Sequence, residues 1–191
     1  MVISTATPAS TTSWHSLHGV LLVVEDTGVL LTGSSGSGKS TLALELLAAG
    51  HALLSDDAPL VRPSPDGRLE GRCPPILRGL LHVRGLGIID VARLYGSQAV
   101  AAPHDIGLWV QISDPTQGFE YPTVERDLHY ASLFGVALPL FRLVPTLGLN
   151  RAVWVECAVR QVEHQAAGEQ HASHTLAQRQ ARRLRGGSSC V

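Results

Sequence analysis

The sequence contains few cysteines and carries almost no net charge. Its three cysteines, Cys73, Cys157 and Cys190, are an odd number at wide spacings, and they form neither a paired metal-ligand pattern nor a disulfide framework. This usage favours a reducing compartment, the cytoplasm. The formal net charge of −1 at pH 7 provides no broad attraction to nucleic acid or to an anionic membrane. We therefore expect neither of them as a partner.

The chain also lacks long apolar runs. None approaches the ~20 residues needed to span a bilayer, and residues 1–13, rich in Ser, Thr and Ala, lack the basic and apolar segments of a secretory signal. Because residues 1–13 show no helical or strand period, we expect a disordered lead-in there. The composition suits one folded domain, which we place at residues 14–162. Residues 163–191 are polar and basic, which predicts a solvated helix or a disordered tail.

Strand and helix patterns alternate in the first part of this domain. Two apolar segments, residues 19–24 and 29–32, flank turn residues and predict a hairpin. Leucines at helical spacing in residues 40–49, followed by Gly50, predict a helix. A buried strand is expected at residues 52–54. This order is typical of an α/β fold.

The patterns in the second half are shorter. Strands are predicted at residues 107–112 and 152–159, an extended segment at residues 139–144, and a helix at residues 123–134. Runs of this length do not separate strand from helix by periodicity alone.

A glycine-rich segment, residues 33–40, matches the pattern G-x-x-x-x-G-K-[ST] without a mismatch, between a predicted strand and a predicted helix. Its glycines let successive N–H groups converge on phosphate oxygens at a helix N-terminus. Lys39 neutralises the outer phosphates, and the Ser40 hydroxyl suits Mg²⁺. The alternative is a flexible Gly/Ser linker. We predict that this segment, the phosphate loop, binds a nucleoside triphosphate or a related polyphosphate. The predicted binding residues are Gly33, Ser34, Ser35, Gly36, Ser37, Gly38, Lys39, Ser40 and Thr41.

Two acids, Asp56 and Asp57, follow the strand predicted after that helix. Ligands bind at the carboxyl ends of strands in open α/β sheets, so these side chains are expected beside the bound phosphates. A carboxylate there can orient the Mg²⁺ shell or accept a proton from an attacking hydroxyl. The alternative is that the two acids only begin a turn before Pro59.

These residues together resemble the HPr serine kinase/phosphorylase family, in a short form that consists of the C-terminal catalytic domain only. The landmarks, in chain order, are His18-Gly19, the phosphate loop, Asp56-Asp57 and the Arg-Gly-Leu-Gly-Ile-Ile segment at residues 84–89. The resemblance is close over residues 18–96, fainter up to about Glu156, and absent in the tail. It implies an α/β P-loop fold of the HPr kinase / phosphoenolpyruvate carboxykinase type, with a mixed central sheet and flanking helices.

The resemblance also implies an activity, namely phosphorylation of a serine on a small HPr-type phosphocarrier protein with ATP or pyrophosphate, and the reverse phosphorolysis. It makes Asp56 the base that takes the seryl proton, and it places His18 and Arg84 near the reacting phosphate. Asp57 and Arg126 are weaker candidates, the latter for an arginine in the family's Tyr-x-Arg segment. On the residues alone, His18 is otherwise a strand-end histidine and Arg84 a surface charge. A homo-oligomer, a hexamer in the family, is implied as well.

Some positions depart from the family pattern. The resemblance assigns Mg²⁺ to Ser40 and Asp56, but His82 stands where the family has an acid, and a neutral imidazole is a poorer Mg²⁺ ligand than a carboxylate. Thr41 also replaces a common acid. Residues 145–150 lack the arginine of the loop associated with phosphorolysis. Two alternatives therefore stay open: a kinase of the same fold for another peptide or a small metabolite, and a non-catalytic nucleotide-binding regulator.

The polar tail holds further histidines and arginines. His164, His171 and His174 lie at a spacing that is short for zinc, with no Cys or acid to complete four ligands, so we favour a solvated tail over a metal site. The arginines at 179, 182, 183 and 185 predict a charged helix face or a disordered end.

Overall fold

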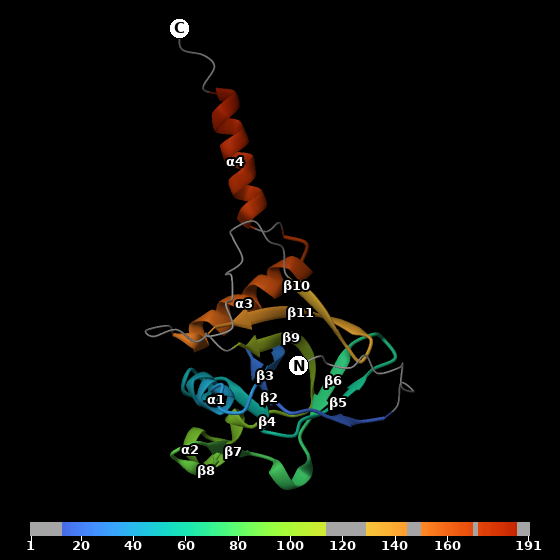
Figure 1. Ribbon diagram of the computed structural model, residues 1–191, viewed down its shortest axis with the longest axis vertical. Helices are drawn as coiled ribbons and strands as arrows, with labels where there is room; N and C mark the ends of the chain where they lie inside the picture. Colours follow the sequence, from blue (N-terminus) through green and yellow to red (C-terminus); the bar gives the residue numbers. More distant parts are fainter. Residues whose placement is uncertain (1–12, 114–128, 145–149, 170–171, 187–191) are drawn as a thin grey trace.

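A mixed sheet with helices packed against it forms the centre of the molecule (Figure 1). The computed structural model describes residues 13–113, 129–144, 150–169 and 172–186. Its elements, in chain order, are β1 (His15–Ser16), β2 (Val20–Val24), β3 (Thr27–Gly33), α1 (Lys39–Ala48), β4 (Ala52–Ser55), β5 (Leu60–Pro63), β6 (Leu69–Arg72), η1 (Pro75–Leu77), β7 (Leu80–Val83), β8 (Gly87–Asp90), α2 (Val91–Tyr95), η2 (Ser97–Ala99), β9 (His104–Ile112), β10 (His129–Leu133), β11 (Val136–Leu143), α3 (Arg151–Ala166) and α4 (Ala172–Gly186).

Strand order explains why the phosphate loop and the acid pair lie at one edge of the sheet. β2 pairs antiparallel with β3 on one side and with β4 on the other. Because β2 runs opposite to both, β3 and β4 end at the same edge. The phosphate loop leaves β3 there, and Asp56 leaves β4 there. Beyond β3 lies parallel β9, followed by parallel β11.

The hairpin of β2 and β3 is buried on both faces of the sheet. Leu22 and Leu31 pack with the buried residues of α1 and α3, whereas Leu21 and Leu30 pack on the opposite face with Trp109. Successive strand residues point to opposite faces, so burial on both sides requires the near-continuous apolar run seen in the sequence. The strand that leads into the phosphate loop is therefore held rigidly from both sides.

Most of the predicted elements are confirmed. The hairpin, helix α1 and the strand β4 lie where the sequence pattern places them, and the predicted strand at residues 107–112 is the C-terminal two thirds of β9. The extended segment predicted at residues 139–144 coincides largely with β11.

The strand predicted at residues 152–159 is wrong, because this segment lies in helix α3. The side chain of Asn150 accepts a hydrogen bond from the backbone N–H of Val153 and so caps the helix N-terminus. The buried residues Ala152, Val155 and Val159 recur at a spacing of three or four. That is a helical period, which the apolar run of the sequence obscured.

The helix predicted at residues 123–134 is also wrong in its described part. Residues 129–133 form strand β10, which pairs antiparallel with β11 from Leu133 opposite Val136 to His129 opposite Leu140. Phe134, with a φ of 51°, lies in the tight turn between β10 and β11. Pairing across this turn stabilises a strand that the local propensity of its residues did not indicate. Residues 123–128 lie outside the described residues.

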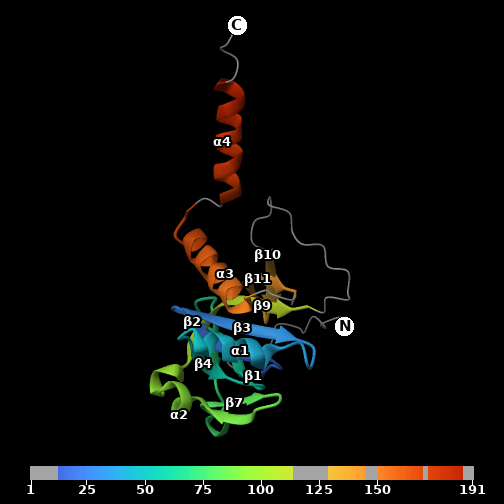
Figure 2. The ribbon, with the colours of Figure 1, turned by 90° about the vertical axis from the view of Figure 1, so that its left-hand side faces the viewer.

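The polar tail holds helix α4, which extends away from the rest of the molecule (Figures 1 and 2). Helix α3 runs across the boundary expected between residues 162 and 163, and where the domain ends stays a prediction. None of the helices in the described parts of the chain is long and apolar enough to cross a membrane.

Candidate active site

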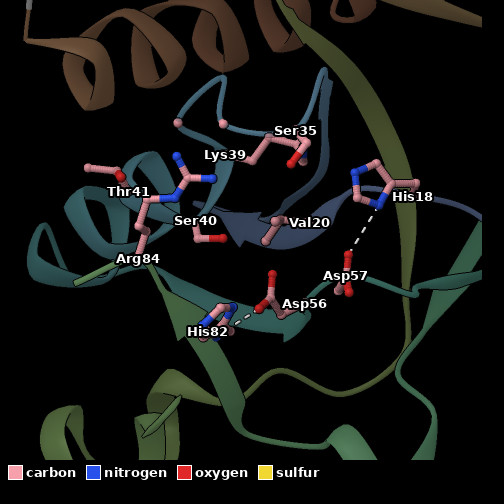
Figure 3. Close-up of a pocket in the computed structure, with 12 residues that line it drawn as sticks. His18, Val20, Ser35, Lys39, Ser40, Thr41, Asp56, Asp57, His82 and Arg84 are labelled. Carbon is pink, nitrogen blue, oxygen red and sulfur yellow. Dashed lines mark hydrogen bonds and ion pairs between the residues drawn. The ribbon is translucent and has the colours of Figure 1, made fainter. Parts of the chain in front are cut away.

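The phosphate loop and the acid pair meet in one cavity of about 380 Å³, which we call the loop cavity (Figure 3). It lies at the sheet edge where β3 and β4 end, and the β7–β8 hairpin forms its opposite wall. Its lining residues are His18, Val20, Ser35, Gly36, Gly38, Lys39, Ser40, Thr41, Asp56, Asp57, His82 and Arg84. The structure therefore brings together the residues that the sequence singled out from four separate segments.

The backbone of the phosphate loop depends on its glycines. Gly36 and Gly38 have φ values of 81° and 96°, a region that side chains with a Cβ rarely adopt. Gly38 is the N-cap of α1, and its carbonyl accepts a hydrogen bond from Leu42 N at 2.9 Å. At Gly33 a Cβ would lie 2.7 Å from the carbonyl oxygen of Ile112. The chain thus forms a close backbone turn at a helix N-terminus, which fits a phosphate group.

Lys39 is folded back onto this loop. Its ammonium group donates hydrogen bonds to the carbonyl oxygens of Gly33 at 3.0 Å and of Ser34 at 3.1 Å, and the residue is 9% exposed. Burial lowers the pKa of Lys39, while the nearby charges of Asp57 and Asp56 oppose that shift. A partly desolvated cation at a helix N-terminus is a favourable place for an anion.

Asp56 is the buried acid of the pair. It is 8% exposed, and its Oδ2 atom accepts a hydrogen bond from the backbone N–H of His82 at 2.8 Å. Burial raises the pKa of Asp56, and the hydrogen bond from His82 opposes this rise. The carboxylate points into the space beside Ser40 (Figure 3). A raised pKa makes a carboxylate a stronger proton acceptor.

Asp57 is directed differently from Asp56. Its φ of 59° is unusual for a residue with a side chain. Its carboxylate faces His18, whereas that of Asp56 lies beside His82 and Ser40 (Figure 3). Asp57 forms an ion pair with His18, 3.1 Å between Oδ1 and Nδ1, with both side chains largely exposed. Such an exposed pair contributes little to stability, and it places His18 at the rim of the loop cavity.

His82 and Arg84 line the cavity from the β7–β8 hairpin. A Cβ on Gly36 would lie 3.5 Å from the nearest guanidinium nitrogen of Arg84, so this arginine reaches across to the phosphate loop (Figure 3). The cavity is thus lined by the cations Lys39 and Arg84 and by the acids Asp56 and Asp57.

The donor set also fits a divalent cation beside a polyphosphate. Ser40 and Asp56 offer the oxygen ligands that Mg²⁺ prefers, and Mg²⁺ keeps several of its waters in such sites. His82 adds an imidazole nitrogen, which suits transition metals better than Mg²⁺.

Several candidates from the sequence do not line the cavity. Gly33, Ser34 and Ser37 belong to the phosphate loop but are not among the lining residues. Ser37 Oγ is buried, with no hydrogen-bond partner within the described part of the chain. Arg126 lies outside the described residues. In the tail, His164 pairs with Glu169, 2.8 Å between Nδ1 and Oε2. The side chains of His171 and His174 lie outside the described part of the chain.

Sequence reasoning missed several residues around the phosphate loop. Arg151, the first residue of α3, forms an ion pair with Glu45 of α1 and lies against Gly38. Val20, at the start of β2, lines the cavity. The signal for Arg151 was its place directly after the helix cap Asn150, which the strand prediction concealed.

Comparisons with known proteins identify the same family over most of the chain. The family model described as "HPr Serine kinase C-terminal domain" matches residues 9–180. The HPr kinase/phosphorylase of Cupriavidus necator is 43% identical over 146 residues, which cover 76% of this chain and 45% of that protein. The HPr kinase/phosphorylase of Burkholderia cenocepacia is 42% identical over 154 residues, covering 80% and 47%. The chain spans less than half the length of these curated relatives.

A solved structure gives the same result for the fold. The Hpr(Ser) kinase/phosphatase from Coxiella burnetii superposes with a TM-score of 0.74 at 29% sequence identity, covering 81% of this chain and 93% of that chain. The predicted fold class, a mixed sheet with flanking helices of the HPr kinase type, is confirmed.

Proposed function

Because the chain belongs to the HPr serine kinase C-terminal domain family, we propose that it is a Mg²⁺-dependent phosphotransferase acting on a serine of a small HPr-type phosphocarrier protein. The phosphoryl donor is ATP or pyrophosphate. One observation carries the proposal: the buried carboxylate of Asp56 lines the same cavity as the phosphate loop and Lys39. The proposed proton acceptor, Asp56, and the phosphate loop can therefore both contact the same reacting group.

The reaction transfers the terminal phosphoryl group in line. The seryl oxygen of the acceptor forms a bond to the terminal phosphorus as the bond to the leaving phosphate oxygen breaks, which releases ADP from ATP or inorganic phosphate from pyrophosphate. Asp56 takes the seryl proton and returns it in the reverse direction. Its Oδ2 atom accepts a hydrogen bond from the N–H of His82, and the carboxylate keeps further lone pairs for the seryl proton and for a metal ligand bond.

Charge stabilisation comes from the groups around the phosphates. The loop N–H groups, Lys39 and Arg84 offset the negative charge that shifts onto the phosphate oxygens during transfer. Mg²⁺, held by Ser40 and Asp56, would supply further charge neutralisation at those oxygens. His18, at the cavity rim, is placed to contact the transferred group or the acceptor.

Exposed apolar side chains beside the cavity favour a protein acceptor over a small metabolite. Leu86 and Ile88 are 65% and 71% exposed. Ile88 is the cross-strand partner of His82, which lines the cavity. An apolar surface at the mouth of a polar site is typical of a docking face for another protein. The acceptor is therefore proposed to place an apolar surface against the β7–β8 hairpin while its serine enters the cavity.

A second candidate function, a nucleotide-binding regulator without catalysis, is favoured by one observation. His82 lines the cavity where the family pattern has an acid, which weakens the expected Mg²⁺ site. Phosphorolysis has less support than the forward reaction, because residues 145–150 lack the arginine of the family's loop associated with phosphorolysis. Cytoplasmic location and homo-oligomer formation stay predictions.

The deciding experiment measures transfer of labelled phosphate. The protein is incubated with γ-labelled ATP and Mg²⁺, and with an HPr-type carrier, the same carrier with its acceptor serine replaced by alanine, or a panel of peptides and small metabolites. Label on the intact carrier alone is the expected result. Label on a different acceptor would support the same chemistry on another substrate. ATP binding without transfer to any acceptor would support the regulator.

A further inference from the structure

An arginine that is distant from the phosphate loop in the sequence lies directly against it in the structure. Arg151 is the first residue of α3, and a Cβ on Gly38 would lie 2.8 Å from its Nη1 atom. The guanidinium group therefore packs on the Cα of the residue that caps α1 and precedes Lys39. Its side chain is 16% exposed, and it does not line the loop cavity itself.

This position is electrostatically unfavourable for a cation in the absence of an anion. The N-terminus of a helix carries a partial positive charge. Arg151 lies at the N-terminus of its own helix and touches the N-cap of α1, where Lys39 adds a further positive charge. The compensating group is Glu45 of α1, which forms an ion pair with Arg151.

Packing alone does not account for such a residue. An apolar side chain could fill the space against Gly38 without placing a charge between two helix N-termini. A bound polyphosphate, by contrast, brings several negative charges to the other side of Gly38. Because Arg151 is mostly shielded from solvent, its attraction for those charges is screened less than that of a surface arginine.

We propose that Arg151 acts through Gly38 as an affinity determinant for the polyphosphate in the loop cavity, and that Glu45 attenuates it. This inference rests on the proposed function, since it assumes that the phosphate loop binds a polyphosphate. Arg151 is a positioning residue here, because it contacts the loop rather than the ligand. Glu45 neutralises part of its charge in the free protein and so weakens the attraction.

The two partners of the ion pair then have opposite effects on binding. Removing the charge of Arg151 weakens polyphosphate binding, whereas removing the charge of Glu45 strengthens it. If the ion pair only held α3 against α1, the result would differ, because losing either partner would loosen the phosphate loop and weaken polyphosphate binding. The sign of the Glu45→Gln effect therefore separates electrostatic attraction from mechanical support.

Titration calorimetry of the full chain with ATP, pyrophosphate and AMP measures these effects. The variants are Arg151→Met, Arg151→Lys and Glu45→Gln. A matched control is available on the same helix, since Arg160 pairs with Glu25, and Arg160→Met with Glu25→Gln removes an arginine–glutamate pair that does not touch the phosphate loop. Thermal melting of every variant checks that the fold is kept.

We expect Arg151→Met to weaken ATP and pyrophosphate binding about threefold to tenfold, and Glu45→Gln to strengthen it about twofold to fivefold. Arg151→Lys keeps most of the affinity, AMP changes little, and added salt reduces all differences. Weaker binding in both Arg151→Met and Glu45→Gln would overturn the inference, as would unchanged affinity in both. Absence of ATP and pyrophosphate binding in the wild-type protein would instead overturn the proposed function.

Discussion

The backbone N–H of His82 donates a hydrogen bond of 2.8 Å to Oδ2 of Asp56. The β7–β8 hairpin therefore orients the carboxylate of Asp56, which directly follows β4, although the two residues are 26 positions apart in the sequence. Since the donor is a backbone group, this restraint does not depend on the side chain at position 82. The orientation of the proposed base and the identity of the neighbouring cavity residue can thus be tested separately.

Asp56→Asn is expected to lower the transfer rate by about 10² to 10⁴-fold, because the amide cannot take the seryl proton. Affinity for ATP without Mg²⁺ should change little, since the phosphate loop stays intact, whereas Mg²⁺ binding should weaken because one proposed ligand is lost. Steady-state transfer to an HPr-type carrier and ATP titration measure the two quantities. The control is Asp66→Asn, because Asp66 pairs with Arg68 and does not line the loop cavity. Full transfer by the Asp56→Asn protein would remove Asp56 from the mechanism.

The same substitution is expected to stabilise the fold at neutral pH. Burial raises the folded-state pKa of Asp56 above its ordinary value of 3.8, so the folded protein holds this proton more tightly than the unfolded chain does. Stability from this group is then present below pH 3.8 and is lost as the pH rises through the folded-state pKa. Denaturant unfolding at several pH values should show that Asp56→Asn stabilises most above that pKa. A uniform loss of stability at every pH would contradict the assignment.

Activity should fall on the acid side as Asp56 is protonated. Burial raises the pKa of Asp56, and Mg²⁺ held by Asp56 would lower it, so the acid limb of the rate profile is expected to move to lower pH as the Mg²⁺ concentration rises. A pH profile of kcat/KM for the carrier measures the limb, and ATP affinity over the same range separates catalysis from binding. An acid limb that stays in place when the Mg²⁺ concentration is changed would argue against Asp56 as the base.

Ile88→Ser and Leu86→Ser are expected to raise KM for the carrier about fivefold, since both side chains are exposed on the proposed docking face. ATP affinity should not change. Tyr130→Ser is a suitable control, because Tyr130 is 61% exposed on β10, at the far side of β11. Equal effects of all three substitutions would show that the hairpin has no special part in docking.

His82→Glu is expected to tighten Mg²⁺ binding to the protein with a non-hydrolysable ATP analogue, because a carboxylate oxygen suits Mg²⁺ better than an imidazole nitrogen. The backbone hydrogen bond to Asp56 should persist. Calorimetric titration with Mg²⁺ measures the affinity, with His82→Gln as the uncharged control. A gain in transfer would identify a weakened enzyme, whereas tighter Mg²⁺ binding without transfer would favour the regulator.

The site could be predicted from the sequence mainly where its residues are set by local pattern. The phosphate loop lies between one strand and one helix, and the strand before Asp56 follows directly, so contiguous residues contain the whole signal. Strand order then places both at one sheet edge, as the α/β pattern indicates. The segment of the β7–β8 hairpin was indicated only by the family resemblance at residues 84–89, and not by a strand or helix periodicity.

The rest depends on contacts between distant segments. Arg151 and Glu45 are 106 positions apart, and no local pattern links them. Strand β10 forms because β11 offers a pairing edge, which outweighs the local propensity of residues 129–133. For α3, the helical period of buried residues was visible only once their burial was known. Tertiary context decides such segments.

A crystal structure with a non-hydrolysable ATP analogue and Mg²⁺ tests the central claim most directly. We expect the outer phosphates to accept hydrogen bonds from the backbone of the phosphate loop and from Lys39, with the carboxylate of Asp56 facing the terminal phosphate. Nucleotide bound away from the phosphate loop, or Asp56 turned away from that phosphate, would contradict the account.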